Sequence, residues 1–223
     1  IGNCKAGTRT CLPDGAELGP CEAQTLPAKE DCSNPADEDC DGFSCSETLW
    51  VDQLSNIQAV AIAADRETGA SYVVGTFLYS AQLGADKFDT AGDTDIFLAK
   101  LDIAGKIVWA RHVGGTTKDS AINVECGNHT VTILAHTNGA LNVEGTAVSV
   151  GVVVVRYQDD GTFVWARPCA GDVSARLGID PISDDAILVG RFAQQLQCGS
   201  QSYSAGGDYD IFTTRIKAAD GTE

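Results

Sequence analysis

The chain has 223 residues, enough for one or two domains with a buried core. Its 15 Lys and Arg residues stand against 31 Asp and Glu residues, which gives a formal net charge of −16. This charge argues against nucleic acid and anionic membrane surfaces as partners, because both are polyanions. Hydrophobic residues make up 43% of the chain, which argues against disorder throughout. No run approaches 18 consecutive apolar residues, so none is long enough to span a membrane. Because the sequence has no Met and starts at Ile1, we expect a processed or excerpted chain.

The first 45 residues hold most of the cysteines, namely Cys4, Cys11, Cys21, Cys32, Cys40 and Cys45. This segment has no CxxC pair and no His, so it is typical of a small module held by disulfides rather than by zinc. We therefore expect residues 1–46 to form a disulfide-rich module, whose pairing the sequence leaves open. The corresponding location is an oxidising one: the periplasm, the outer cell surface or the medium. Farther along we expect a disulfide between Cys169 and Cys198, which leaves Cys126 free or paired with another chain.

An acidic segment in this module has the pattern of a cation site. Asp37, Asp39 and Asp41 alternate and are followed by Gly, which allows a short loop to wrap oxygen ligands around a hard cation. The backbone carbonyl of Phe43 and the carboxylate of Glu47 complete the predicted ligand set. Oxygen ligands without His or Met favour calcium over copper. The alternative is a solvated acidic loop that the disulfides hold without a metal.

Residues 47–223 repeat themselves. Trp50, Trp109 and Trp165 stand 59 and 56 residues apart and mark three repeats, at about 50–108, 109–164 and 165–223. The first and third repeats match at a constant offset of 115 residues, which lays Gly-Asp-Thr-Asp-Ile-Phe at 92–97 on Gly-Asp-Tyr-Asp-Ile-Phe at 207–212. The second repeat has Gly-Val-Val where the others have Asp-Ile-Phe.

Each repeat consists of short strand-like runs. In the first repeat they are Ala59–Ala64, Ser71–Tyr79, Asp95–Asp102 and Lys106–Val113, with a short hairpin around Leu83–Phe88. These runs alternate in polarity, are rich in β-branched and aromatic residues, and are separated by Gly, Asp and Thr turns. Four strands in about 57 residues, repeated three times, predict an all-β fold of β-propeller-type repeats, in which each sheet hides its faces by stacking on its neighbours.

Two stretches of sequence resemble known families. The runs YVVGTF, AGDTDIFLAKLDIAGKIVWARHVGG and SAGGDYDIFTTRIKAADG resemble the bacterial seven-bladed-propeller-like repeats (SBBP type) of secreted and cell-surface proteins. The N-terminal run CKAGTRTCLPDGAELGPCEAQTLPAKEDCSNPADEDCDG resembles the cysteine-rich, metal-binding motif common on myxobacterial surface proteins. Together these resemblances cover almost the whole chain. They imply an extracellular propeller-like architecture and say little about activity.

Candidate binding residues recur in the repeats. Asp93 and Asp95, like Asp208 and Asp210, lie at the start of equivalent strands. They could bind a cation or another ligand on a propeller face, or accept hydrogen bonds from backbone amides where a strand begins. The tryptophans could stack on sugars or pack in the core. The histidines His112, His129 and His136 are scattered, and no catalytic motif accompanies them, so we predict that the chain is not an enzyme.

The repeats raise a question of closure, because closed propellers have four to eight blades. The third repeat has no counterpart of the first repeat's last strand, whereas Thr48–Leu54 carries Trp50 as a spare copy of it. Three alternatives follow: an excerpt of a longer propeller, a small closed ring, or donation of this strand to another copy.

We predict a secreted or surface-exposed structural or adhesive protein, a subunit of an extracellular assembly or filament whose partners are other protein chains. The alternative is a lectin-like module that binds a glycan or peptide, and an extracellular hydrolase is less favoured.

Overall fold

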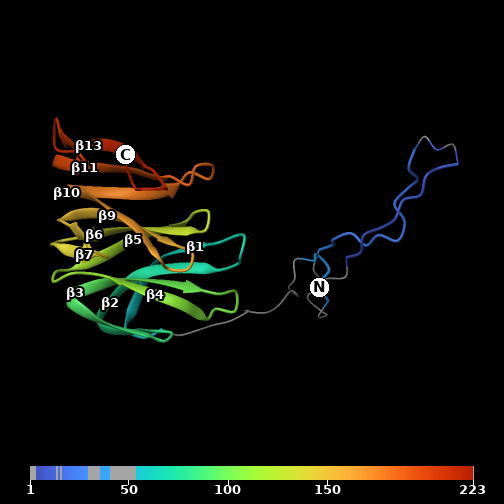
Figure 1. The fold of residues 1–223 in the computed structure, drawn as a ribbon, viewed down its shortest axis with the longest axis horizontal. Coiled ribbons are helices and arrows are strands. Elements are labelled where there is room, and N and C mark those ends of the chain that lie inside the picture. The colour runs from blue at the N-terminus through green and yellow to red at the C-terminus, as the bar shows by residue number, and fades with distance from the viewer. Residues whose placement is uncertain (1–3, 14, 16, 30–35, 41–53, 223) are drawn as a thin grey trace. The chain divides into compact units, whose positions relative to one another are not determined.

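The computed structural model describes residues 4–13, 15, 17–29, 36–40 and 54–222, and these residues form an all-β protein. The chain divides into two compact parts, Ile1–Val51 and Asp52–Glu223. All the described strands lie in the second part, here called the β-body (Figure 1). Among the described residues, no helix is long and apolar enough to cross a membrane.

The first repeat, completed by the start of the second, forms a four-stranded antiparallel sheet in the order β1-β2-β3-β4. From here on each repeat is counted together with the strand that completes its sheet, so that β4 belongs to the first repeat and the first half of β10 to the second. Its strands are β1 (Ile57–Ala64), β2 (Ser71–Leu83), β3 (Asp86–Leu101) and β4 (Ile107–Val113). The turn between β1 and β2 depends on Asp65, whose carboxylate accepts hydrogen bonds from the amides of Glu67 and Thr68, and on Gly69, whose φ is +71°. The structure confirms the four predicted strands and the hairpin that joins β2 to β3.

The second and third repeats form a seven-stranded sheet and a separate two-stranded hairpin. The strands are β5 (Asp119–Cys126), β6 (Thr130–Thr137), β7 (Leu141–Val143), β8 (Thr146–Val148), β9 (Gly151–Gln158), β10 (Phe163–Ile179), β11 (Ala186–Cys198), β12 (Gln201–Ser204) and β13 (Asp210–Ile216). The larger sheet has the order β12-β11-β10-β9-β6-β5, and β13 pairs with β11; β7 and β8 pair with each other.

Strand β10 belongs to two repeats. Its first half pairs with β9 and its second half with β11, and the register shifts at Gly171, whose φ is +125°. Such a bulge bends a strand without ending it. At the equivalent point of the first repeat, residues 114–118 separate β4 from β5 instead. The prediction of a separate four-stranded sheet is therefore confirmed for the first repeat, whereas the second and third share one bent strand. The described sheets do not close into a ring, so the β-propeller stays a prediction.

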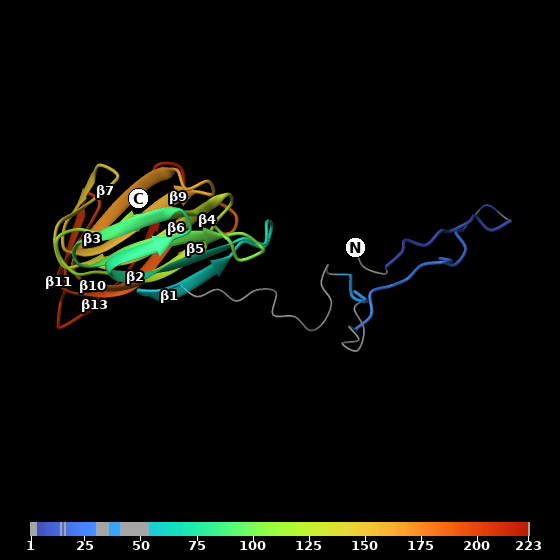
Figure 2. The same ribbon diagram turned by 90° about the horizontal axis from the view of Figure 1, so that it is seen from below.

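The sheets stack face to face, with the first repeat at the bottom of Figure 1 and the third at the top; Figure 2 looks onto the first. One apolar cluster joins the first repeat to the second, and another joins the second to the third. Val153 and Val155 of β9 belong to the first cluster, and Val152 and Val154 to the second. Alternate side chains of a strand point to opposite faces of the sheet. The unbroken run of four valines is therefore explained by the burial of both faces of β9.

The repeats share one cross-strand arrangement. Residues at the same position of different repeats are called counterparts below. In the first repeat Gly75 faces Phe97, in the third Gly190 faces Phe212, and in the second the pair is Ala135 and Val153. A side-chain carbon at Gly75 would lie 2.7 Å from the Phe97 ring, and one at Gly190 the same distance from the Phe212 ring. The carbonyl oxygens of the adjacent strand would be closer still, at 2.1 Å for Gln58 and 2.3 Å for Ser174, so this backbone and the ring together require Gly at both positions.

Candidate functional site

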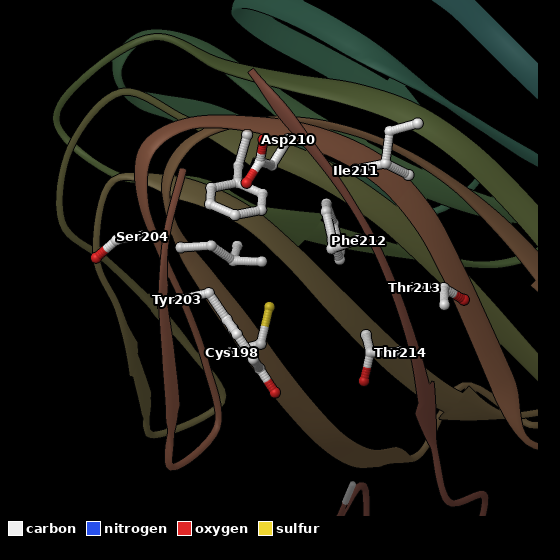
Figure 3. A pocket seen from close by; sticks show the side chains of 10 residues that line it. Cys198, Tyr203, Ser204, Asp210, Ile211, Phe212, Thr213 and Thr214 are labelled. Atoms are coloured by element: carbon white, nitrogen blue, oxygen red, sulfur yellow. The ribbon is translucent and has the colours of Figure 1, made fainter. Parts of the chain in front are cut away.

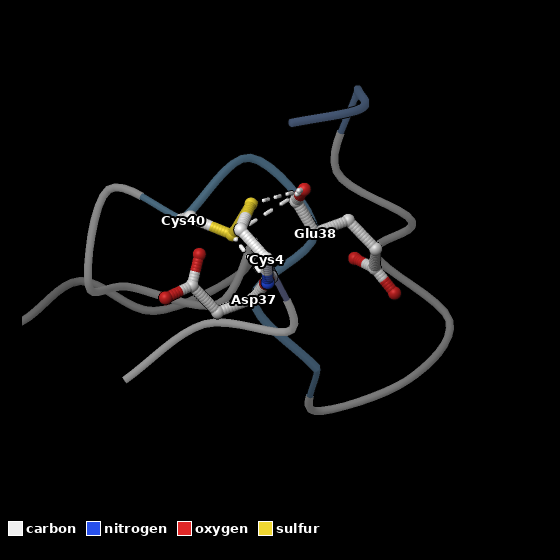
Figure 4. The surroundings of a disulfide bond; sticks show 4 residues. All are labelled: Cys4, Asp37, Glu38 and Cys40. Atoms are coloured by element: carbon white, nitrogen blue, oxygen red, sulfur yellow. Dashed lines mark hydrogen bonds between the residues drawn. A yellow bond between two sulfur atoms is a disulfide. The ribbon is translucent and has the colours of Figure 1, made fainter. Parts of the chain in front are cut away.

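The predicted cation site lies in the N-terminal part, beside a disulfide. Cys4 and Cys40 are bonded, with their Cα atoms 6.1 Å apart, so this bond ties the acidic segment, between Asp39 and Asp41, to the start of the module. The amide of Ala28 also donates to the carbonyl of Glu38 at 2.9 Å. Asp37 and Asp39 are half-buried here. Figure 4 shows the carboxylates of Asp37 and Glu38 pointing in different directions from the disulfide.

The described residues supply only part of the predicted ligand set. Asp37 and Asp39 are present, whereas Asp41, Phe43 and Glu47 lie outside the described residues. Within the part of the chain that the structure describes, no three His, Cys, Asp or Glu side chains gather as a metal site would require. The calcium site therefore stays a prediction whose outcome depends on the remaining ligands.

The cysteine predictions are met in part. Cys169 and Cys198 form the expected disulfide across β10 and β11, and Cys126 is a free thiol whose pKa burial raises to about 12. Cys32 and Cys45 lie outside the described residues. Cys11 and Cys21 are free thiols, so the expectation that all six N-terminal cysteines form disulfides is wrong for these two. The register explains this: Cys11 faces Leu18, and the neighbour of Cys21, Glu22, faces Thr8, so the two thiols are not opposite each other.

The recurring aspartates hold backbone amides. Asp95 accepts a hydrogen bond from the amide of Ala91 at 2.8 Å, and its counterpart Asp210 accepts one from Gly206 at 3.0 Å. Asp119, which the sequence analysis missed, accepts one from Gly115 at 2.7 Å. In each case the donor lies four residues before the Asp. A small residue four positions before an Asp is therefore the sequence pattern that could have predicted these hydrogen bonds. Asp93 and Asp208 are exposed. The structure supports the backbone-capping interpretation of Asp95 and Asp210.

The described tryptophans pack between repeats. The indole of Trp109 donates to the carbonyl of Asp159 at 2.9 Å, and that of Trp165 to the carbonyl of Ala218 at 3.0 Å. Each indole therefore binds a turn of the next repeat. Both rings are buried, which confirms packing rather than an exposed stacking surface at these two positions. Trp50 lies outside the described residues.

Ion pairs between repeats were not predicted. Lys100 of β3 pairs with Asp159 of the second repeat, and its counterpart Arg156 pairs with Asp184 of the third. The Lys100 ammonium and the Tyr72 hydroxyl lower the pKa of Asp159. The repetition of a cation at positions 100, 156 and 215 was visible in the sequence. The acidic partners were not, because the stacking of the sheets selects them.

The outer face of the third repeat is apolar and exposed. Ile187, Val189 and Ile211 have exposed fractions of 37%, 51% and 83%. Their first-repeat counterparts are, in order, Tyr72, Val74 and Ile96. Those counterparts are at most 1% exposed, because they pack against the second repeat. The apolar face that the first repeat buries against the second is therefore exposed in the third repeat, where no described residue covers it.

A pocket of about 350 Å³ opens beside β13 on the same repeat (Figure 3). Its lining includes the aromatic side chains of Phe192, Tyr203 and Phe212, together with Asp210 and Thr214. In the described residues β13 pairs with β11 alone. The pocket therefore lies along a strand edge and combines apolar rings with a carboxylate.

No protein-family model matches this chain, and no curated protein sequence matches it.

Proposed function

We propose that this chain is a structural or adhesive subunit of an extracellular assembly, built from β-propeller-type repeats that resemble the SBBP type. The observation that carries the proposal is the exposed apolar face of Ile187, Val189 and Ile211, whose counterparts are buried between repeats. Exposure of an apolar patch of this kind to water is energetically unfavourable, so the patch indicates an interaction surface. Copies of the chain associate through this face, as stacked repeats do within the chain. The proposal assigns the chain no catalytic activity.

The location follows from the disulfides and the charge. The bonds Cys4–Cys40 and Cys169–Cys198 are typical of an oxidising compartment. The proposal places the chain outside the cell or on its outer surface, with the periplasm as the alternative compartment. The net charge of −16 favours solubility and disfavours polyanionic partners.

Light scattering of the full chain tests the association. Wild type should have a mass that is a multiple of the single-chain mass, and Val189→Asp should shift it toward the monomer. Val150→Asp is the matched control, because Val150 is 49% exposed against 51% for Val189 but lies in the second repeat, away from the face. A monomeric wild type, or equal effects of the two variants, would contradict the proposal.

The N-terminal module holds calcium as a structural staple in this proposal. Asp37 and Asp39 supply carboxylates beside the Cys4–Cys40 disulfide, and Asp41, Phe43 and Glu47 complete the oxygen set. Calcium titration by calorimetry should show binding that Asp37→Asn/Asp39→Asn removes, and a chelator should lower the melting temperature of the wild type. An unchanged melt in chelator would exclude the staple.

A second candidate function is lectin-like binding of a glycan or peptide. The pocket beside β13 supports it, because Tyr203 offers a ring for stacking and Asp210 a hydrogen-bond acceptor. A glycan array compares wild type with Tyr203→Ala. Binding that this variant abolishes would favour the lectin, and a blank array would favour the assembly subunit.

A further inference from the structure

The segment that joins the first repeat to the second departs from the repeat pattern. Residues 114–118 belong to neither β4 nor β5, whereas the chain passes from the second repeat to the third through a bulge at Gly171 inside β10. The segment is packed tightly on two sides. A side-chain carbon at Gly92 of β3 would lie 2.5 Å from the carbonyl oxygen of Thr116, and one at Gly139 would lie 2.5 Å from the Thr117 hydroxyl. A departure from the pattern that is held rigidly is expected where a chain carries a site.

Two buried carboxylates reach this segment, one from each repeat. Asp95 lies on β3 of the first repeat and Asp119 at the start of β5 of the second, and both are 0% exposed. A side-chain carbon at Gly114 would lie 2.5 Å from Asp95 Oδ1, and the amide of Gly115 donates to Asp119 Oδ2 at 2.7 Å. The two carboxylates therefore contact the same pair of glycines.

Each carboxylate leaves one oxygen without a partner. Asp95 Oδ2 accepts a hydrogen bond from the amide of Ala91 at 2.8 Å and lies 2.6 Å from His112 Nε2. Asp95 Oδ1, by contrast, is buried and has no hydrogen-bond partner among the described residues, and the same holds for Asp119 Oδ1 and the Thr117 hydroxyl. Leaving buried polar atoms unpaired is costly, most of all for charged groups. Three such oxygen atoms at one junction therefore point to a ligand that they bind.

The chemistry of these atoms selects the ligand. Two carboxylates and a hydroxyl offer oxygen alone, and the two negative charges require a cation. Calcium binds about six to eight oxygen atoms in flexible geometry, so backbone carbonyls of residues 114–118 and water can complete the set. Within the described residues no third acid, His or Cys joins the two carboxylates to form a three-residue metal site, which argues against zinc and copper.

We propose that Asp95, Asp119 and Thr117 bind a calcium ion, which links the first repeat to the second. This site lies in the β-body and is separate from the one predicted in the N-terminal module. His112 and the amide of Ala91 hold the Asp95 carboxylate by its other oxygen, as hydrogen bonds to metal-binding carboxylates commonly do. The ion adds a third kind of contact between these repeats, beside apolar packing and an ion pair.

A proton is the alternative occupant of this place. Burial raises the pKa of Asp119, and the charge of Asp95 adds to this effect, so without calcium Asp119 binds a proton more tightly than an exposed carboxylate does. The pH dependence of stability that this proton causes belongs to the calcium-free chain. Calcium and a proton compete for the same oxygen atoms, so binding of calcium at neutral pH distinguishes the two.

Calorimetric titration with calcium at neutral pH tests the site in the full-length chain. The background is Asp37→Asn/Asp39→Asn, which removes two ligands of the predicted N-terminal site. This background should bind one equivalent of calcium, and calcium should raise the urea midpoint of its β-body. Adding Asp119→Asn should weaken the binding by about tenfold or more, and adding Thr117→Val should weaken it several-fold. Both substitutions keep the shape of the side chain, so the variants should stay folded.

Adding Asp210→Asn to the background is the matched control. Asp210 is the counterpart of Asp95 and accepts a hydrogen bond from the amide of Gly206 at 3.0 Å, but it lies in the third repeat and is partly exposed. The calcium affinity of this variant should equal that of the background. Equal losses with Asp119→Asn and Asp210→Asn would indicate a general effect on folding and would overturn the inference.

The outcomes separate this site from the N-terminal one. A background that binds no calcium overturns the inference, and so does an unchanged affinity after Asp119→Asn or Thr117→Val. Binding that wild type shows and the background loses entirely overturns it as well and leaves the N-terminal staple standing. Equal binding by wild type and background supports the site in the β-body and overturns the staple. None of these outcomes depends on the association of copies, which light scattering tests separately.

Discussion

Asp184→Asn should destabilise the β-body more than the loss of any exposed carboxylate. The Asp184 carboxylate pairs with the Arg156 guanidinium across the second and third repeats, and the Arg156 side chain is 1% exposed. The same carboxylate accepts hydrogen bonds from the amide of Asn128 at 2.9 Å and from the hydroxyl of Thr130 at 3.1 Å. Asp184 has a φ of 65°, which Asn tolerates, so the substitution removes the charge without adding backbone strain.

The magnitude follows from the burial of the cation. Removing one partner of a buried ion pair costs about 3–5 kcal/mol, because the other charge stays buried without compensation. Arg156 keeps two bonds in the variant, one to the carbonyl of Asp184 at 2.8 Å and one to Thr130 at 2.7 Å. The loss should therefore be at the lower end, about 3 kcal/mol. The Lys100–Asp159 pair has side chains that are 13% and 30% exposed, so Asp159→Asn should cost less.

Urea unfolding followed by tryptophan fluorescence measures the loss, with the m value expected to stay constant. Asp89→Asn is the control, because Asp89 is 72% exposed and its contact with Lys87 is 3.8 Å long. A loss below about 1 kcal/mol for Asp184→Asn, or one equal to the control, would refute the argument that Arg156 depends on this charge.

Three further predictions test other parts of the β-body. Replacing Cys169 and Cys198 by Ser removes a disulfide between residues 29 positions apart, which should lower the unfolding free energy of the β-body by about 3–4 kcal/mol in urea; reductant should reproduce this loss in wild type and cause no further loss in the β-body of the variant, whose remaining Cys4–Cys40 disulfide lies in the N-terminal part. Burial raises the pKa of Asp119 above its ordinary value, so the folded state binds that proton more tightly than the unfolded chain. Wild type should therefore lose stability relative to Asp119→Asn as the pH rises from about 4 through the folded-state pKa, and a constant difference would contradict this. Trp109→Phe removes the hydrogen bond to the carbonyl of Asp159 and should cost about 1 kcal/mol or more, while an unchanged midpoint would argue against the packing role.

The local sequence was sufficient to predict the strands of the first repeat, because turn residues mark where they end. Asp65 and Gly69 separate β1 from β2, and Asp102 with Gly105 separates β3 from β4, as their hydrogen bonds and positive φ values require. The continuity of β10, which joins the second and third repeats into one sheet, was not predictable in the same way. Gly is a typical turn residue, yet Gly171, with a φ of +125°, lies at a bulge inside β10 and does not end the strand. A single Gly is compatible with either outcome, and the pairing with β9 and β11 decides between them.

The candidate site was less predictable than the fold, since its residues come from different repeats. Asp159 belongs to a hairpin turn by its local sequence, but the structure makes it the acceptor for Tyr72 and Lys100 of another sheet. Cys11 and Cys21 show the converse. Their presence in a cysteine-rich segment suggested disulfides, whereas the ladder register of the N-terminal part sets them at positions that do not face each other. Composition predicts which groups are available, and register determines which of them meet.

The cation that recurs in each repeat bears on the association of copies proposed above. Lys100 and Arg156 both reach into the next repeat of the stack. Their counterpart Arg215 instead contacts Asp180 and Asp185 of its own repeat, and its side chain is 53% exposed. An exposed ion pair of this kind contributes little to stability, so Arg215 can exchange its partners for those of a docked copy at small cost. The third repeat therefore retains both components of the contact between repeats, the apolar face and the cation. The proposed association of copies would extend the stacking that already holds the chain together and would require no new kind of interface.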